Sequence, residues 1–147
     1  MNRLRSFIRL PADVRPLLIE AFFLLVYIRI GLWLTSLPRL RQTLKRWARP
    51  RAAAPAVEDA NREKIAWVVH VASGYLPNTN CLPQALAAQV LLSRLALPAA
   101  LHLGVARDQA GQFKAHAWVE SGGVIVVGGP ESRSQYTPLP AKEWESL

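Results

Sequence analysis

The pattern of apolar positions first predicts a helix near the N-terminal end of the chain. Residues 17–37 form the most apolar stretch, which at roughly 1.5 Å per residue would reach across about 30 Å of bilayer core. Glu20 and Arg29 interrupt this stretch and fall on opposite sides of a helix. We therefore expect a helix partly buried against protein, with association at a membrane surface or a true membrane span as the alternatives. A second helix, rich in Arg and Lys, is predicted from Pro38 to Trp47.

Two further helices are predicted in the middle of the chain. Between residues 61 and 72 apolar side chains recur with the spacing of one helix face, and Gly74 follows as a stop signal. Residues 82–95 are apolar and rich in Ala, with Pro83 in the first turn, where a missing N–H does no harm. Pro98 is expected to end this helix.

Alternation of apolar and polar residues then predicts strands. The alternating segments are residues 100–107 and 112–120, and residues 124–127 form a short apolar run. Turn residues separate them at 108–111 and 121–123. We expect three adjacent antiparallel strands.

Charge divides the chain into two parts. Residues 1–51 contain eleven Lys or Arg against two acidic residues, a net charge of +9, whereas the remainder is close to neutral. Residues 49–59 have two prolines and several small residues, which is typical of a linker. We therefore predict a basic, apolar helical region at 1–51, a linker at 52–60 and a folded domain at 61–147.

Composition argues against several classes of protein. A nucleic-acid-binding domain normally spreads basic side chains over its folded body, and here the body is nearly neutral, so no nucleic-acid partner is expected. The single cysteine forms no intramolecular disulfide, and no spacing of Cys or His resembles a zinc site. A reducing, cytoplasmic location is the simplest fit. His70 lies off the apolar stripe of its helix and is expected to be a surface or supporting side chain.

Cys81 and His116 are the candidates for chemistry. Cys81 directly precedes a predicted helix, where free backbone N–H groups and the helix dipole stabilise a thiolate and can bind an oxyanion. His116 lies in an amphipathic strand, from which an imidazole can take the thiol proton and return it to a leaving amine. A small buried cysteine and an exposed strand histidine are the alternatives.

The segment CLPQALAAQVLLSRLALPAALHLGVARDQAGQFKAHAWVESGGVIVVGG, residues 81–129, resembles the core of lasso peptide biosynthesis B2 proteins, the transglutaminase-like leader peptidases of bacterial lasso peptide pathways. The basic N-terminal region and the YTPL at residues 136–139 are similar as well. The resemblance implies an α+β, papain-like or transglutaminase-like fold, in which a helix bearing the cysteine packs on a small antiparallel sheet bearing the histidine, after an N-terminal helical extension. It also implies a Cys-His-Asp triad, and its first two members correspond to Cys81 and His116.

The third triad member has no clear counterpart. A three-residue turn centred on Gly122 would place Gly128 opposite His116, and glycine has no side chain to orient an imidazole. Glu131 is our candidate, although a solvated loop position is the alternative for it. Glu120, about 13 Å along the same strand face, a backbone carbonyl and a water molecule are other substitutes.

Three more residues are expected near the site. A tight turn centred on Ala110 would place Gly104 opposite His116, where a glycine allows close approach of a peptide substrate or forms a bulge. Trp118, next to His116 on the same face, is expected to cover the site and exclude water. Gln84, one turn after Cys81, is expected either near the oxyanion site or on the helix surface.

The resemblance implies a leader peptidase that cleaves a ribosomally made precursor peptide. It also implies two partner proteins, a leader-recognition B1 protein and the lasso cyclase. ATP dependence is associated with the family at the level of the pathway, but the chain has no Gly-rich phosphate-binding loop and no other recognisable cofactor motif. Two alternatives stay open, a non-catalytic adaptor that contacts a membrane surface through residues 1–51, and an acyltransferase or transglutaminase that uses the same two residues.

Overall fold

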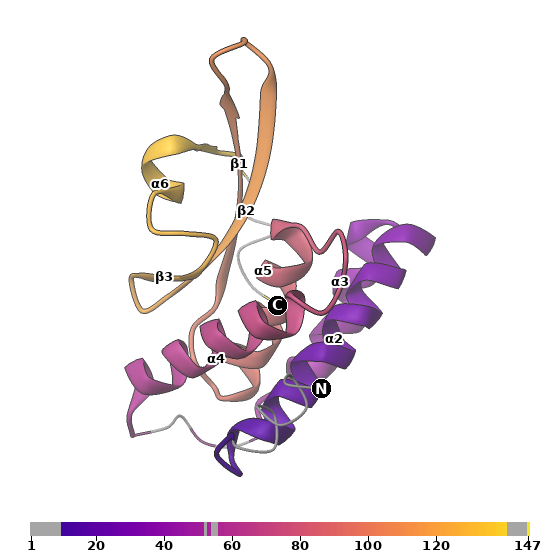
Figure 1. The fold of residues 1–147 in the computed structure, drawn as a ribbon, viewed down its shortest axis with the longest axis vertical. Helices are drawn as coiled ribbons and strands as arrows, with labels where there is room; N and C mark the ends of the chain where they lie inside the picture. The colour runs from indigo at the N-terminus through magenta and orange to yellow at the C-terminus, as the bar shows by residue number, and fades with distance from the viewer. Residues whose placement is uncertain (1–9, 52, 54–55, 141–146) are drawn as a thin grey trace.

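The computed structural model describes residues 10–51, 53, 56–140 and 147. Helices cover one face of a small antiparallel sheet, and a short helix lies beyond its other face (Figure 1). This arrangement confirms the α+β class. The elements are α2 (Val14–Leu34), α3 (Leu37–Trp47), α4 (Glu58–Ser73), α5 (Cys81–Arg94), β1 (Ala100–Arg107), β2 (Phe113–Ser121), β3 (Val124–Val127), α6 (Ser132–Gln135) and β4 (Thr137–Pro138).

The apolar helix α2 packs along one side against protein. Five of its side chains are at most 6% exposed and belong to the hydrophobic core: Leu18, Ala21, Leu24, Leu25 and Ile28. By length and composition α2 is also long and apolar enough to cross a membrane. Only 28% of its apolar stretch is buried inside the protein. One side of α2 therefore belongs to the hydrophobic core, whereas its other side exposes large apolar side chains.

Glu20 on α2 is neutralised by arginines that are distant in sequence. Its carboxylate accepts a hydrogen bond from Arg51 at 3.2 Å and forms an ion pair with Arg94 near the end of α5. Arg94 also donates to the carbonyl of Trp47 at 2.6 Å. Glu20 thus joins α2 to α5 through Arg94, and the same arginine joins α5 to α3.

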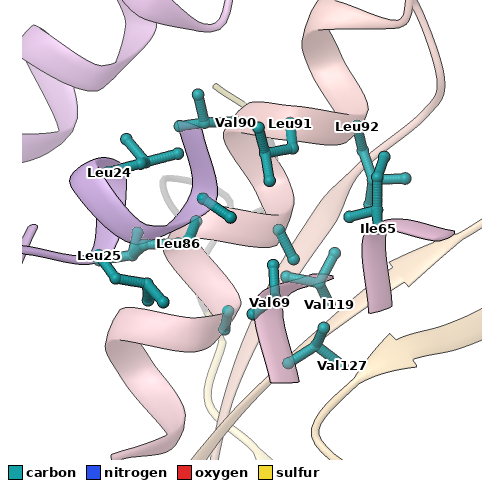
Figure 2. Packing of buried hydrophobic residues seen from close by; sticks show 14 of the residues in the cluster. Leu24, Leu25, Ile65, Val69, Leu86, Val90, Leu91, Leu92, Val119 and Val127 are labelled. Atoms are coloured by element: carbon teal, nitrogen blue, oxygen red, sulfur yellow. The ribbon is translucent and has the colours of Figure 1, made fainter. Parts of the chain in front are cut away.

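Helix α5 lies at the centre of the molecule. Every residue from Ala85 to Leu92 is buried, because α5 contacts α2 and α4 on one side and the sheet on the other. Figure 2 shows Leu86, Val90 and Leu91 of α5 among apolar side chains from α2, α4 and the sheet. The helix ends at Arg94, four residues before Pro98, after which Ala96 takes a positive φ of 56°. The Pro98 stop signal therefore marks the start of the next segment rather than the last helical residue.

Buried polar side chains join elements that the apolar core leaves separate. Arg62 on α4 donates to the hydroxyl of Ser121 at the end of β2, at 2.9 Å, and forms ion pairs with Glu58 and Asp59 on its own helix. Gln89 on α5 accepts a hydrogen bond from Arg41 of α3 and donates to the carbonyl of Ala99. These bonds satisfy polar groups that would otherwise be costly to bury.

The sheet has the order β3-β2-β1-β4, and β1 pairs antiparallel with β2. Gly104 lies opposite His116, as the turn centred on Ala110 predicted. In this turn the Asp108 carboxylate accepts hydrogen bonds from the backbone N–H groups of Ala110 and Gln112. The prediction of three strands is incomplete, because β4 adds a short strand at the free edge of β1.

The predicted register between β2 and β3 is wrong. Gly122 and Gly123 both have positive φ, 58° and 81°, and form a two-residue turn that pairs Ser121 with Val124. An irregularity between Val119 and Glu120 then pairs Val119 with Val127. This pairing directs Gly128 toward Trp118, where a Cβ on Gly128 would clash with the Trp118 Cβ.

The N-terminal region and the rest of the chain share one core. Buried residues of α2 and α3 belong to the same hydrophobic cluster as those of α4, α5 and the sheet. Helix α4 begins at Glu58, inside the predicted linker, and residues 52, 54 and 55 of that linker lie outside the described residues. The division at 1–51, 52–60 and 61–147 stays a prediction about chain segments.

The buried side of α2 is expected to stabilise the fold, in contrast to its exposed side. Replacing Leu25, which is fully buried, with Ala should lower the free energy of unfolding by about 2–5 kcal/mol. Phe23→Ala on the exposed side is the matched control, with a change within about 0.5 kcal/mol. Urea denaturation of both variants measures the difference. Equal effects of the two substitutions would contradict a core role for α2.

Candidate active site

Cys81 is the first residue of α5 and is partly buried. The preceding Asn80 is extended, with ψ near −178°, so the chain enters the helix abruptly and the thiol lies at the helix N-terminus. The first turn contains no acidic residue, and Pro83 supplies no N–H there. The remaining free N–H groups and the positive end of the helix dipole favour an anion at this position. This placement matches the expected location of the cysteine.

The loop before Cys81 is held in place by local hydrogen bonds. The Gln84 amide donates to the carbonyl of Thr79 at 3.0 Å, and the Thr79 hydroxyl donates to the carbonyl of Leu76, also at 3.0 Å. Asn78 has a positive φ of 55°, which asparagine tolerates better than most residues. Gln84 therefore fixes the loop that leads to Cys81, and through this bond its side chain is directed toward the loop.

The ring of His116 is held by the segment after β3. Its Nε2 lies 2.8 Å from the Gly128 carbonyl oxygen and 3.1 Å from the Ser132 hydroxyl oxygen. The Ser132 hydroxyl donates to the same carbonyl at 2.8 Å, and Ser132 is only 3% exposed. The ring also stacks on Tyr136, with centroids 4.7 Å apart. Hydrogen bonds and stacking together set the orientation of the imidazole.

Gly128 therefore contributes to the histidine through its backbone. A carbonyl oxygen can only accept, so Nε2 must bear a hydrogen and donate it. The other ring nitrogen, Nδ1, is then the one that can accept a proton while the ring is neutral. Glu131, our candidate for the third triad position, is exposed at the start of α6, and its carboxylate lies near Gly129. Among the described contacts, the groups that bond the imidazole are Gly128 and Ser132.

The alternation of side chains along β2 decides to which face His116 points. Side chains alternate along a strand, and Ala117 and Val119 of β2 belong to the core that α4 and α5 cover, as Figure 2 shows for Val119. His116 therefore points to the other face, toward the segment that contains α6, where its ring contacts Ser132. No hydrogen bond joins the thiol to the imidazole among the described residues. Each residue thus lies where expected within its own element, and the described state contains no hydrogen bond between the two.

Trp118 and Gly104 share the face of the sheet that bears His116. Trp118 is 1% exposed and stacks between His102, at 5.4 Å, and His116, at 6.1 Å between centroids. A Cβ on Gly104 would lie 2.8 Å from the Trp118 ring and 3.0 Å from the Tyr136 Cβ. Gly104 thus makes room for these two aromatic residues, without a bulge in the pairing of β1 with β2. In the described state both residues take part in packing, and their expected roles toward a substrate stay predictions.

Glu120 joins this cluster to α6. Its carboxylate forms a bidentate ion pair with Arg133 and accepts a hydrogen bond from the Trp118 indole at 3.1 Å. Nε2 of His102 lies 3.7 Å from the second carboxylate oxygen. The hydrogen bond from Arg133 is the main reason why the pKa of Glu120 lies below its ordinary value, against the opposing effect of burial. Glu120 therefore anchors the segment that holds His116.

Sequence reasoning missed Ser132, Arg133 and the stacking role of Tyr136. These residues lie in a polar stretch without periodicity, and only the return of the chain across the sheet brings them to the histidine. The YTPL segment was the one available signal, since Tyr136 opens it. In the part of the chain that the structure describes, no group of three or more His, Cys, Asp or Glu side chains is placed to hold a metal ion.

An open hollow adjoins the histidine side of the sheet. It has a volume of about 710 Å³ and lies between the tip of the β1–β2 hairpin and Tyr136. Arg107, Asp108 and Lys114 line it with charge of both signs. Because Tyr136 also stacks on His116, a peptide bound in this hollow would contact the residue that orients the imidazole.

A family model described as the transglutaminase-like superfamily matches residues 24–141. The match covers most of the chain, so the protein belongs to the transglutaminase-like superfamily. Both Cys81 and His116 fall within it, as do α3, α4, α5 and the whole sheet. No curated protein matches the chain, and neither does any solved structure.

The bonding of His116 predicts its tautomer. In the neutral ring the hydrogen should reside on Nε2, because the Gly128 carbonyl accepts it. Nitrogen chemical shifts of the labelled protein, followed through the titration of the ring, measure this directly, with the exposed His70 as the internal control. Ser132→Ala should preserve the Nε2–H form, because Gly128 still accepts the hydrogen. A neutral ring protonated on Nδ1 would contradict the described contact.

Proposed function

We propose that this protein is a cysteine peptidase that removes the leader peptide from a ribosomally synthesised lasso peptide precursor. The observation that supports this most strongly is Cys81 at the N-terminus of α5 within a domain of the transglutaminase-like superfamily. The resemblance of residues 81–129 to lasso peptide B2 proteins suggests the substrate. Superfamily membership supports cysteine peptidase or transglutaminase-type chemistry, and the leader peptide is the more specific part of the proposal.

The reaction requires a thiolate and a proton donor. Cys81 Sγ attacks the carbonyl carbon of the bond between leader and core, after its proton has passed to His116. Backbone N–H groups at the start of α5 bind the oxyanion. His116 gives its proton to the leaving amine as the C–N bond breaks, which leaves a thioester. Water, deprotonated by the same imidazole, hydrolyses the thioester and regenerates the thiol.

This mechanism requires the two residues to meet. The described residues contain no hydrogen bond between the thiol and the imidazole, so the reaction requires a state in which Sγ and a ring nitrogen come within hydrogen-bonding distance. Nδ1 is the nitrogen suited to face the thiol, because Nε2 is already bonded to Gly128. The open hollow beside Tyr136 offers a place where a bound peptide would alter the packing of the histidine.

The orienting group of the proposed site is the Gly128 carbonyl, supported by the Ser132 hydroxyl. Both bond Nε2, which leaves Nδ1 to face the thiol in the proposed mechanism. A carbonyl dipole stabilises an imidazolium less than a full negative charge does. Glu131 would have to move from its exposed position to take over this role.

The proposal includes partners. The precursor peptide is the substrate, a separate B1 protein recognises its leader, and the lasso cyclase receives the core peptide. Any ATP dependence would then belong to the pathway and its other enzymes. A cytoplasmic location fits the single reduced cysteine, with contact to a membrane surface through residues 1–51 as an addition.

Removing the nucleophile should abolish cleavage. Cys81→Ala should lower the rate of leader release by at least about a thousandfold, because no other group forms the thioester. Mass spectrometry of the precursor, incubated with the protein and its B1 partner, measures the product. Ser93→Ala, in the last turn of the same helix, is the matched control and should retain activity. Undiminished cleavage by Cys81→Ala would rule out this mechanism.

The rate of Cys81 alkylation tests whether His116 activates the thiol, without a measurement of turnover. If substrate assembles the dyad, His116→Ala should slow the reaction of Cys81 with iodoacetamide in the presence of precursor and B1 protein, and have little effect on the free protein. An equal rate in both proteins and both states would show that His116 does not activate the thiol.

Two substitutions test whether Ser132 or Glu131 helps to orient the His116 imidazole. Ser132→Ala should lower turnover about tenfold, because the imidazole loses one of its two bonding partners, whereas Glu131→Gln should leave turnover unchanged. Thermal unfolding of both variants excludes loss of the fold as the cause. A large loss for Glu131→Gln, with Ser132→Ala unaffected, would instead assign the third position to Glu131.

Two other functions use the same scaffold. A non-catalytic adaptor is favoured by one observation, the lack of a hydrogen bond between Cys81 and His116 among the described residues. Such a protein would support processing equally well with Ala at position 81. An acyltransferase would form the same thioester but transfer the acyl group to an amine, so a labelled primary amine would appear in the product.

A further inference from the structure

The outer side of α2 is an exposed apolar stripe. Its members recur at helical spacing along one side of the helix, opposite to the side that packs in the core. The side chain of Trp33 is 85% exposed and that of Phe23 is 65% exposed. A contiguous exposed apolar patch of this kind marks an interaction site. We call this surface the α2 stripe, and it comprises Ile19, Phe23, Ile30, Trp33 and Leu34.

Helix α3 extends the stripe and adds aromatic area. The rings of Tyr27 and Trp47 pack together, with centroids 4.3 Å apart, which places the end of α3 beside the middle of α2. Phe23 and Trp47 also line one open hollow with Arg51. The stripe is therefore continuous with Trp47, itself 37% exposed.

Basic side chains are exposed on α3, the helix that extends this apolar area. Those that α3 and the residues just after it expose to solvent are Arg39, Lys45, Arg46 and Arg49. The two acidic residues of the described N-terminal segment are both paired, Asp13 with Lys64 at 2.6 Å and Glu20 with Arg51 and Arg94. The region thus presents uncompensated positive charge next to exposed apolar and aromatic groups.

The opposite side of α2 limits how a membrane can be engaged. Leu18, Leu25 and Ile28 are at most 6% exposed within the shared core, and a helix that spans a bilayer would have to leave that core. Glu20 would lose its arginine partners as well. An α2 that stays packed can therefore place only its outer side in the lipid interface.

We propose that the α2 stripe and the basic residues of α3 form a docking surface for an anionic membrane, on which α2 lies parallel to the bilayer plane. Apolar side chains enter the boundary between headgroups and acyl chains, Trp33 lies at the interface, and Arg and Lys bind anionic headgroups. The charge favours this occupant over a second copy of the chain, whose equally basic surface would repel it.

Vesicle flotation tests the proposal. The full-length protein should float with vesicles of phosphatidylglycerol and phosphatidylcholine, and binding should fall steeply with salt and with the phosphatidylglycerol content. Trp33→Ser should weaken binding about tenfold. The double variant Lys45→Gln and Arg46→Gln should weaken it by at least about tenfold, because each cation near the surface contributes about fivefold.

Matched controls lie elsewhere on the molecule. Trp67→Ser removes an exposed tryptophan on α4, and Lys114→Gln with Arg107→Gln removes two cations from the hairpin; both should bind vesicles like the wild type. Alkaline carbonate should release the protein, as expected for contact without spanning. Absence of binding, equal losses in the controls, or resistance to carbonate would each overturn the proposal. So would a dimer that Trp33→Ser dissociates, which would assign the stripe to a second copy.

Discussion

The burial of α5 is the constraint on which the rest of the structure depends. Every side chain from Ala85 to Leu92 is enclosed by α2 and α4 on one side and by the sheet on the other. The helix therefore cannot shift without disturbing each of its neighbours. This rigidity holds Cys81, its first residue, at the edge of the core, where a helix N-terminus can stabilise a thiolate.

The two faces of β2 pack against different parts of the protein. Ala117 and Val119 complete the core under α4 and α5, whereas His116 and Trp118 pack against the chain that returns after β3. The consequence for function is a histidine that is well oriented and yet, among the described contacts, not hydrogen-bonded to the cysteine. If the proposed peptidase mechanism is right, substrate binding has to change the packing of Tyr136 and the Gly128 contact, which makes this segment the natural point of control.

Helix α2 combines two surfaces that are usually found in different proteins. Its inner side contributes Leu25 and Ile28 to the core, and its outer side exposes Trp33 and Phe23 beside the basic helix α3. A catalytic domain whose structural core includes a membrane-docking helix would hold its site at a fixed distance from the bilayer. Peptidase activity and membrane contact would then be linked through one helix instead of a flexible tether.

The sequence by itself determined the four longer helices, the pairing of Gly104 with His116 and the position of Cys81 at a helix start, because these depend on periodicity and on turns of a few residues. Only the tertiary structure decided the rest. The Gly122–Gly123 turn and the shift between Val119 and Glu120 set a register between β2 and β3 that differs from the predicted one, since turns of two or three residues are both compatible with SGG. Contacts such as Glu20 with Arg94, 74 residues apart, or His116 with Ser132 arise where the chain returns on itself, and no local pattern encodes them.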